Sequence, residues 1–142
     1  MKTNPKRIVL YLILGLSVTM IMVSFSSCSR KTVFLPSSVV PAAEGHVKVK
    51  KDKNQNYVIT LKVENLAEVD KMQPPKKTYV VWMETDRGDA KNIGQIVSSR
   101  NLNANFETVS SFRPVKIFLT AEDNENAQRP GLVVLSTDKF WD

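Results

Sequence analysis

The side chains that most often carry out chemistry in proteins are sparse in this chain. One histidine, His46, and one cysteine, Cys28, occur among its 142 residues. A general base needs a nucleophile and an orienting group nearby, and no pattern in the sequence supplies them for His46. The sequence contains neither a glycine-rich phosphate loop nor a serine nucleophile elbow. We therefore predict that the protein is not an enzyme and has no catalytic residue and no cofactor.

Two other polar clusters also have a plain structural interpretation. Glu122, Asp123 and Glu125 offer the hard oxygen ligands that calcium prefers, but their spacing lacks the alternation and the glycine of known calcium loops. Positions 87–89 spell Arg-Gly-Asp, an integrin-binding tripeptide, yet glycine and aspartate are also what a hairpin turn requires. We interpret the acidic cluster as a solvated loop and the tripeptide as a turn, and we predict no metal site.

The single cysteine follows a segment with the features of a secretory signal. Basic residues within the first seven positions precede an uncharged, mostly apolar run of 18 residues, 8–25, which ends in small side chains. The sequence Phe-Ser-Ser-Cys at 25–28 resembles the lipobox of bacterial lipoproteins, in which the thiol is lipidated and becomes the new N-terminus. A lone cysteine in an exported domain has no disulfide partner, and lipidation accounts for its presence.

The lipobox resemblance implies that residues 1–27 are a lipoprotein signal peptide and that Cys28 is the lipidation site. The protein would then be a membrane-anchored lipoprotein of the cell envelope, facing the periplasm or the exterior. Membrane lipid, through Cys28, is the expected partner, and an envelope protein is a second candidate. Two alternatives stay open. The apolar run is also within the ~17–25 residues of a membrane-spanning helix, and cleavage without lipidation would release a soluble secreted protein.

The composition indicates a globular domain with mild charge. Hydrophobic residues make up 42% and charged residues 24% of the chain. The formal net charge of +6 falls to +3 without the three basic residues that precede the apolar run, and the remaining basic residues are scattered. We therefore expect no nucleic-acid partner. Nothing in the sequence indicates a small-molecule substrate.

The rest of the chain is organised around residues 78–84, Thr-Tyr-Val-Val-Trp-Met-Glu. β-Branched and aromatic residues bounded by turn residues predict a strand. Alternate positions from Tyr79 to Met83 point to one side, and Val80 and Trp82 point to the other. Both faces are apolar, so we expect a strand that is covered on both sides. We also expect Trp82 to fill the core between two layers of strands.

Six other short segments alternate or are apolar enough to form strands: 46–50, 57–64, 92–98, 106–109, 115–120 and 131–136. About seven strands without a sustained helical pattern predict an all-β fold, an antiparallel Greek-key, immunoglobulin-like β-sandwich over residues 45–142. Residues 28–44 contain prolines and no sustained period, so we expect a tether with at most an edge strand. We expect a loop at 65–75, and a bulge or close backbone approach at Gly94.

Several of these segments resemble the extracytoplasmic domain of anti-sigma-K factors. That family has a Tyr and a Trp on a core strand, a Gly on the next strand, a Thr-x-Glu that ends a later strand and a Pro that opens the last one. The matching segments here are 74–82, 92–94, 117–122 and 130–135, within roughly 45–137. The resemblance implies that six residues are structural: Tyr79, Trp82, Gly94, Phe118, Thr120 and Glu122.

Other parts of the sequence depart from this family. Family members carry a cytoplasmic sigma-binding domain before a membrane helix, whereas only residues 1–7 precede the apolar run here. We therefore expect an orphan copy of the outer domain on a lipid anchor. The expected function is that of a non-catalytic, lipid-anchored cell-envelope binding or structural module. The alternative is a sensory or regulatory partner of a separate transmembrane anti-sigma system.

Overall fold

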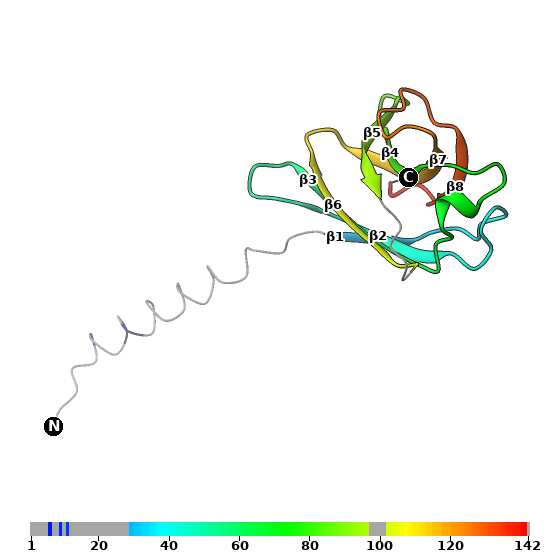
Figure 1. The fold of residues 1–142 in the computed structure, drawn as a ribbon. Helices are drawn as coiled ribbons and strands as arrows, with labels where there is room; N and C mark the ends of the chain where they lie inside the picture. Colours follow the sequence, from blue (N-terminus) through cyan, green and yellow to red (C-terminus); the bar gives the residue numbers. More distant parts are fainter. Residues whose placement is uncertain (1–5, 7–8, 10, 12–28, 97–101, 142) are drawn as a thin grey trace.

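The computed structural model describes residues 6, 9, 11, 29–96 and 102–141, and within these ranges the chain forms two facing four-stranded sheets (Figure 1). The first sheet has the order β1 (Ser29–Val33), β2 (Glu44–Lys51), β3 (Tyr57–Glu64) and β6 (Ala104–Ser110). The second has the order β5 (Ala90–Ile96), β4 (Thr78–Thr85), β7 (Pro114–Glu122) and β8 (Leu132–Ser136).

Every strand pair is antiparallel, and the chain passes between the sheets three times. β3 and β4 lie in different sheets, β6 returns to pair with β3, and β7 then pairs with β4. This is a Greek-key sandwich of the immunoglobulin-like kind. The all-β prediction is confirmed, and each of the seven predicted segments contains or overlaps a strand. The described residues hold eight strands rather than about seven.

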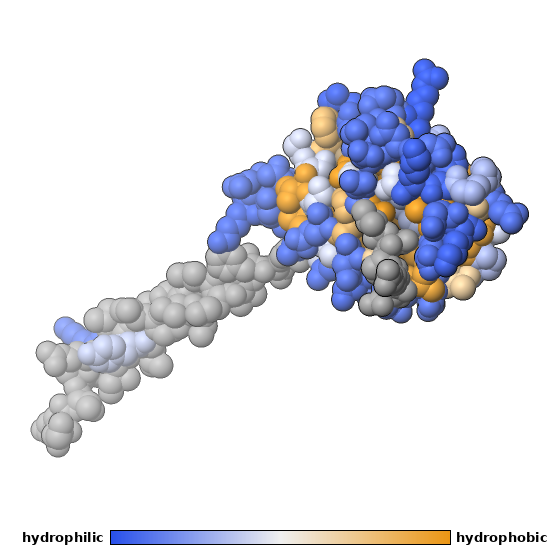
Figure 2. Space-filling model, in the orientation of Figure 1, coloured by the Kyte–Doolittle hydropathy of each residue, from blue (hydrophilic) through white to orange (hydrophobic). Residues whose placement is uncertain are grey.

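The core lies between the sheets because one apolar face of each strand points inward. Val47 and Val49 of β2 and Ile59 and Leu61 of β3 have exposed fractions of 2% or less. They belong to the same buried cluster as the inward residues of the other sheet, Tyr79, Val81, Met83, Ile117 and Leu119. Each such side chain contributes roughly 1.5–3 kcal/mol by leaving water. On the face of the sandwich that Figure 2 shows, hydrophilic residues cover most of the coloured surface.

The expected position of Trp82 between the sheets is wrong. The alternation along β4 is as predicted, with Tyr79, Val81 and Met83 in the inter-sheet core and Val80 and Trp82 on the other face. However, the first sheet covers the Tyr79 face of β4. Trp82 is nevertheless only 1% exposed, because the chain between β7 and β8 covers the outer face of this sheet.

The described part of the expected tether, 29–44, contains the edge strand that the sequence allowed, and it belongs to the sandwich rather than to a linker. Ser29–Val33 forms the edge strand β1, paired along its whole length with β2. The following residues pack on the sandwich, since Phe34, Val40 and Ala43 are buried in the main core. Phe34 also forms an isolated bridge with Thr137, which joins this segment to the second sheet.

The connection from β3 to β4 closes one end of the core. The expected loop contains one 3-10 turn, η1 (Val69–Lys71), and it buries Leu66 and Met72. The Tyr79 hydroxyl donates a hydrogen bond to the Ala67 carbonyl at 2.9 Å. Burial raises the pKa of Tyr79 to about 12, so this phenol stays protonated and keeps its role as a donor at neutral pH.

Candidate functional site

A second, smaller apolar cluster lies on the outer face of the β4–β7 pair. Trp82 of β4 is opposite Phe118 of β7, and their rings stack with centroids 6.3 Å apart and planes at 10°. Val80 completes the buried set, and Ala127 packs on it from the β7–β8 connection. The strand register and the alternation of side chains therefore bring together two of the predicted structural residues.

A chain of buried hydrogen bonds runs from the Trp82 ring to the start of β8. The indole N–H donates to the Thr120 hydroxyl at 2.7 Å, and that hydroxyl donates to Glu122 Oε1 at 2.5 Å. The same carboxylate oxygen accepts the backbone N–H of Gly131 at 2.6 Å. The Thr-x-Glu pattern thus ties Trp82 to the far end of the connection that covers it.

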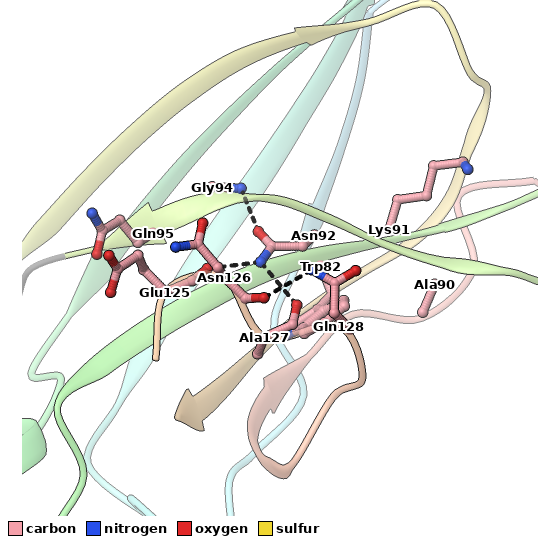
Figure 3. Close-up of a pocket in the computed structure, with 10 residues that line it drawn as sticks. All are labelled: Trp82, Ala90, Lys91, Asn92, Gly94, Gln95, Glu125, Asn126, Ala127 and Gln128. Carbon is pink, nitrogen blue, oxygen red and sulfur yellow. Dashed lines mark hydrogen bonds between the residues drawn. The ribbon is translucent and has the colours of Figure 1, made fainter. Parts of the chain in front are cut away.

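Asn92 of β5 holds the middle of that connection. Its amide nitrogen donates to the Glu125 carbonyl at 2.8 Å and to the Ala127 carbonyl at 3.2 Å. Its side-chain oxygen accepts the Gly94 N–H at 3.1 Å, as Figure 3 shows. One side chain therefore uses both ends of its amide group to join β5 to the β7–β8 connection.

Gly94 is at a β-bulge, as the strand prediction expected for this position. Val81 pairs with Gly94 while Trp82 pairs with Asn92, so Ile93 is the extra residue. Gly94 has φ of +142°, and a Cβ there would lie 2.7 Å from the Phe106 ring. Glycine is required because the backbone is in a conformation that other residues rarely adopt and passes close to this ring.

An open pocket of about 700 Å³ lies between β5 and the β7–β8 connection (Figure 3). Its wall is mostly polar, with amide groups from both sides, one ammonium group and one carboxylate: Trp82, Ala90, Lys91, Asn92, Gly94, Gln95, Glu125, Asn126, Ala127 and Gln128. Such a lining offers hydrogen bonds to a polar ligand or to a partner's backbone. The lining residues include no paired base and nucleophile.

The structure separates the predicted structural residues into three places. Trp82, Phe118, Thr120 and Glu122 are together on the outer face, and Gly94 lies beside them on β5. Tyr79 is on the opposite face of β4, within the inter-sheet core. The aromatic residues Tyr79, Trp82 and Phe118 therefore do not line one groove.

His46 lies on the outer face of β2, where it is half-buried. Its neighbours across the strands are Val33 of β1 and Lys62 of β3. The pKa of His46 is lowered, first because partial burial disfavours the imidazolium and then because Lys31 and Lys62 repel it. The lowered pKa favours the neutral imidazole at pH 7.

The acidic cluster predicted near the end of β7 does not converge on one point. Glu122 is buried and bonded to Thr120 and Gly131, whereas Asp123 forms an ion pair with Lys76 at 2.7 Å. Glu125 lies in the pocket wall. Within the described ranges, no group of three His, Cys, Asp or Glu side chains is arranged to hold a metal ion.

The Arg-Gly-Asp tripeptide forms the tip of the β4–β5 hairpin, with Gly88 at φ of +81°. Asp89 is engaged within the turn, because it accepts a hydrogen bond from Thr85 Oγ1 and pairs with Lys91 at 2.8 Å. Hydrogen bonds from Lys91 and Thr85 lower the pKa of this carboxyl group.

The proposed lipidation site, Cys28, lies outside the described residues, as does most of the apolar run at 8–25. Among the residues that the structure does describe, no helix has the length and hydropathy to cross a bilayer. Ser29, the residue after Cys28, is the first residue of β1.

The sequence did not indicate the roles of three residues around the outer-face cluster of Trp82. The Asn92 amide binds the β7–β8 connection, and the Gly131 N–H donates to Glu122. Ala127 packs on the cluster itself. The only sign of the role of Asn92 in the sequence is its position two residues before Gly94. That spacing indicates a local turn, and it does not indicate a hydrogen-bond partner more than 30 residues away.

Comparisons with known proteins provide no relative for this chain: no family model, no curated protein and no solved structure matches it. The resemblance to the outer domain of anti-sigma-K factors therefore stays a prediction from the residues quoted above.

Proposed function

We propose that this chain is a non-catalytic, lipid-anchored module of the bacterial cell envelope that binds a partner or has a structural role there. A lipidated Cys28 would be its membrane attachment, and the sandwich would be its working part outside the cytoplasm. The lone cysteine and the lipobox-like residues before it support the anchor.

The observation that carries this proposal is the position of β1. Ser29 follows Cys28 directly and is already paired with Lys50 of β2. A lipid on Cys28 would therefore hold the sandwich at the membrane without a spacer, since one residue spans at most ~3.6 Å. Two acyl chains or more are enough for stable anchoring.

The pocket beside Trp82 supports a binding role. Its polar wall is built on β5 and on a connection fixed by Asn92 and Glu122, so its groups are held in place before a partner arrives. Loops held on a rigid sandwich are where folds of this kind place recognition.

A second candidate function is that of a sensory or regulatory partner of a separate transmembrane anti-sigma system. The favouring observation is that Trp82, Gly94, Thr120 and Glu122, which carry the anti-sigma-K resemblance, gather around the β7–β8 connection. In this case the same pocket would be the surface for the regulatory protein.

The anchor is tested with the Cys28→Ala variant. We expect the wild type to fractionate with membranes and to incorporate radiolabelled fatty acid, because acyl chains would be joined to the Cys28 thiol. Cys28→Ala should lose the label and with it the membrane retention of the lipidated form. Ser29→Ala, which keeps the thiol, is the matched control and should behave like the wild type.

The opposite result is equally clear. If the wild type carries no fatty acid and Cys28→Ala stays in the membrane fraction to the same extent, residues 8–25 act as an uncleaved anchor and the lipoprotein proposal fails.

A further inference from the structure

The turns at one end of the sandwich lie where Cys28 joins the fold. Ser29 of β1 pairs with Lys50, one residue before the end of β2, and Tyr57 of β3 pairs with Ser110 at the end of β6. The β2–β3 turn and the β6–β7 turn therefore adjoin the start of β1, and we call this region the Ser29 end. Figure 1 shows the β2–β3 hairpin extending beyond the first residue of β1.

The Ser29 end presents aromatic rings flanked by cations. The half-buried Trp141 ring contacts two guanidinium groups, with the central carbons of Arg30 and Arg113 at 4.6 and 4.7 Å from its centroid. Phe112, in the β6–β7 turn, is 40% exposed, and Lys91 Nζ lies 4.6 Å from its ring. Two cations on one indole repel each other, so an anionic group placed near them would be favourable.

Basic side chains outnumber acidic ones at this end, and two of the carboxylates already have partners within the fold. Asp52 accepts the N–H groups of Asn54 and Asn56 at 2.8 and 2.9 Å, and Asp89 is paired with Lys91. Asp86 and Asp138 are exposed. The exposed basic residues are more numerous: Arg30, Lys50, Lys51, Lys53, Arg113 and Lys139. The hairpin that carries Lys51 and Lys53 is strongly hydrophilic in Figure 2.

Chain length places this end close to the proposed anchor. Arg30 is two residues after Cys28, so their Cα atoms are at most about 7 Å apart. The headgroup layer of one leaflet is roughly 5–7 Å thick. A lipid on Cys28 would thus hold Arg30 within reach of the headgroups, together with the Trp141 ring that it contacts.

We propose that the Ser29 end lies on anionic phospholipid headgroups. Arg30, Lys51, Lys53 and Arg113 bind their phosphate groups, and Phe112 and Trp141 enter the interface. Tryptophan is enriched at membrane interfaces, and each Lys or Arg near an anionic leaflet strengthens binding about fivefold. This inference rests on the proposed lipid anchor, and it adds an orientation: the pocket beside Trp82 would be reached from the side or from the far end.

The test uses the full chain, extracted from membranes and reconstituted into vesicles that contain a headgroup-labelled nitroxide phospholipid. Vesicles of phosphatidylcholine alone are compared with vesicles that also contain phosphatidylglycerol. Trp141 is the reporter, because Trp82 is only 1% exposed and lies in the outer-face cluster. Subtracting the emission of Trp141→Phe isolates its signal. We expect at least twofold stronger quenching of Trp141 in the anionic vesicles, and a loss of this excess in ~1 M salt, where the Debye length is ~3 Å.

A charge-matched pair of variants checks the surface. Lys51→Gln with Lys53→Gln should reduce the quenching to the level seen in phosphatidylcholine. Lys71→Gln with Lys77→Gln removes the same charge from the exposed β3–β4 connection and should leave the quenching unchanged. The cations over the Trp141 ring are Arg30 and Arg113, and both pairs leave them in place.

Flotation separates the two proposals. In one outcome, the wild type floats with both kinds of vesicle and yet shows equal quenching of Trp141 in both. This result would keep the anchor and overturn the membrane contact. It is the result expected if the Ser29 end binds a protein instead of lipid. Failure to float with either kind of vesicle overturns the anchor, and the membrane contact with it.

Discussion

Trp82→Ala is expected to lower the free energy of unfolding by about 3–5 kcal/mol, the usual cost of truncating a buried tryptophan. The ring is 1% exposed, stacks on Phe118 and donates to Thr120, so the change removes packing and leaves a buried hydroxyl without its donor. Small domains are stable by only ~5–15 kcal/mol, so the loss would be a large fraction of the total. Urea unfolding followed by far-ultraviolet circular dichroism measures it.

A matched variant and a local probe sharpen this experiment. Trp82→Phe keeps most of the apolar surface and should cost less than the alanine. Cleavage after Glu125 by a glutamate-specific protease reports on the β7–β8 connection, and it should become faster in Trp82→Ala because Ala127 loses its contact. Unfolding and cleavage both at wild-type levels would mean that the outer-face cluster does not hold this connection.

Glu122→Ala is expected to cost about 2–3 kcal/mol. The carboxylate accepts hydrogen bonds from the Thr120 hydroxyl and the Gly131 N–H, and its removal leaves buried or half-buried donors without an acceptor. An unsatisfied buried group costs about 1–3 kcal/mol, and bonds to charged groups are the stronger ones. The same urea titration gives the value.

Glu122→Gln is the matched control because it keeps a carbonyl oxygen where Gly131 donates. It should therefore retain most of the stability that Glu122→Ala loses. If the glutamine variant is as unstable as the alanine variant, the negative charge matters more than the hydrogen bonds. If both are as stable as the wild type, the Thr-x-Glu pattern does not fix the start of β8.

The fold was largely predictable because strand alternation is a local property. In β4 the pattern correctly assigned Tyr79 and Trp82 to opposite faces, and the turn residues around each segment gave its approximate bounds. Alternation cannot say which face of β4 meets the opposite sheet, since that depends on the packing of the whole chain. This is why Trp82 was expected between the sheets and instead lies beneath the β7–β8 connection.

The sequence allowed an edge strand in the expected tether but did not indicate that this segment is part of the sandwich, and the cause is different. β1 reads Ser-Arg-Lys-Thr-Val, has only exposed or half-buried side chains and owes its conformation to backbone pairing with β2. Polar edge strands are typical of β-proteins but carry little hydrophobic pattern. The buried residue that fixes this segment, Phe34, comes after the strand has ended.

The candidate site was predictable only as a set of structural residues. Trp82, Phe118, Thr120 and Glu122 were identified individually, but their joint role depends on contacts with the β7–β8 connection. Asn92 bonds carbonyl groups more than 30 residues away, and such long-range pairing leaves no mark in the local sequence.

Whether a lipid on Cys28 holds the sandwich at the membrane is tested most directly by the mass of the N-terminal peptide of the protein extracted from membranes. We expect a peptide that begins at Cys28 and carries a diacylglyceryl group on its sulfur. A peptide that begins at Met1, or one cleaved elsewhere and free of lipid, would contradict this expectation.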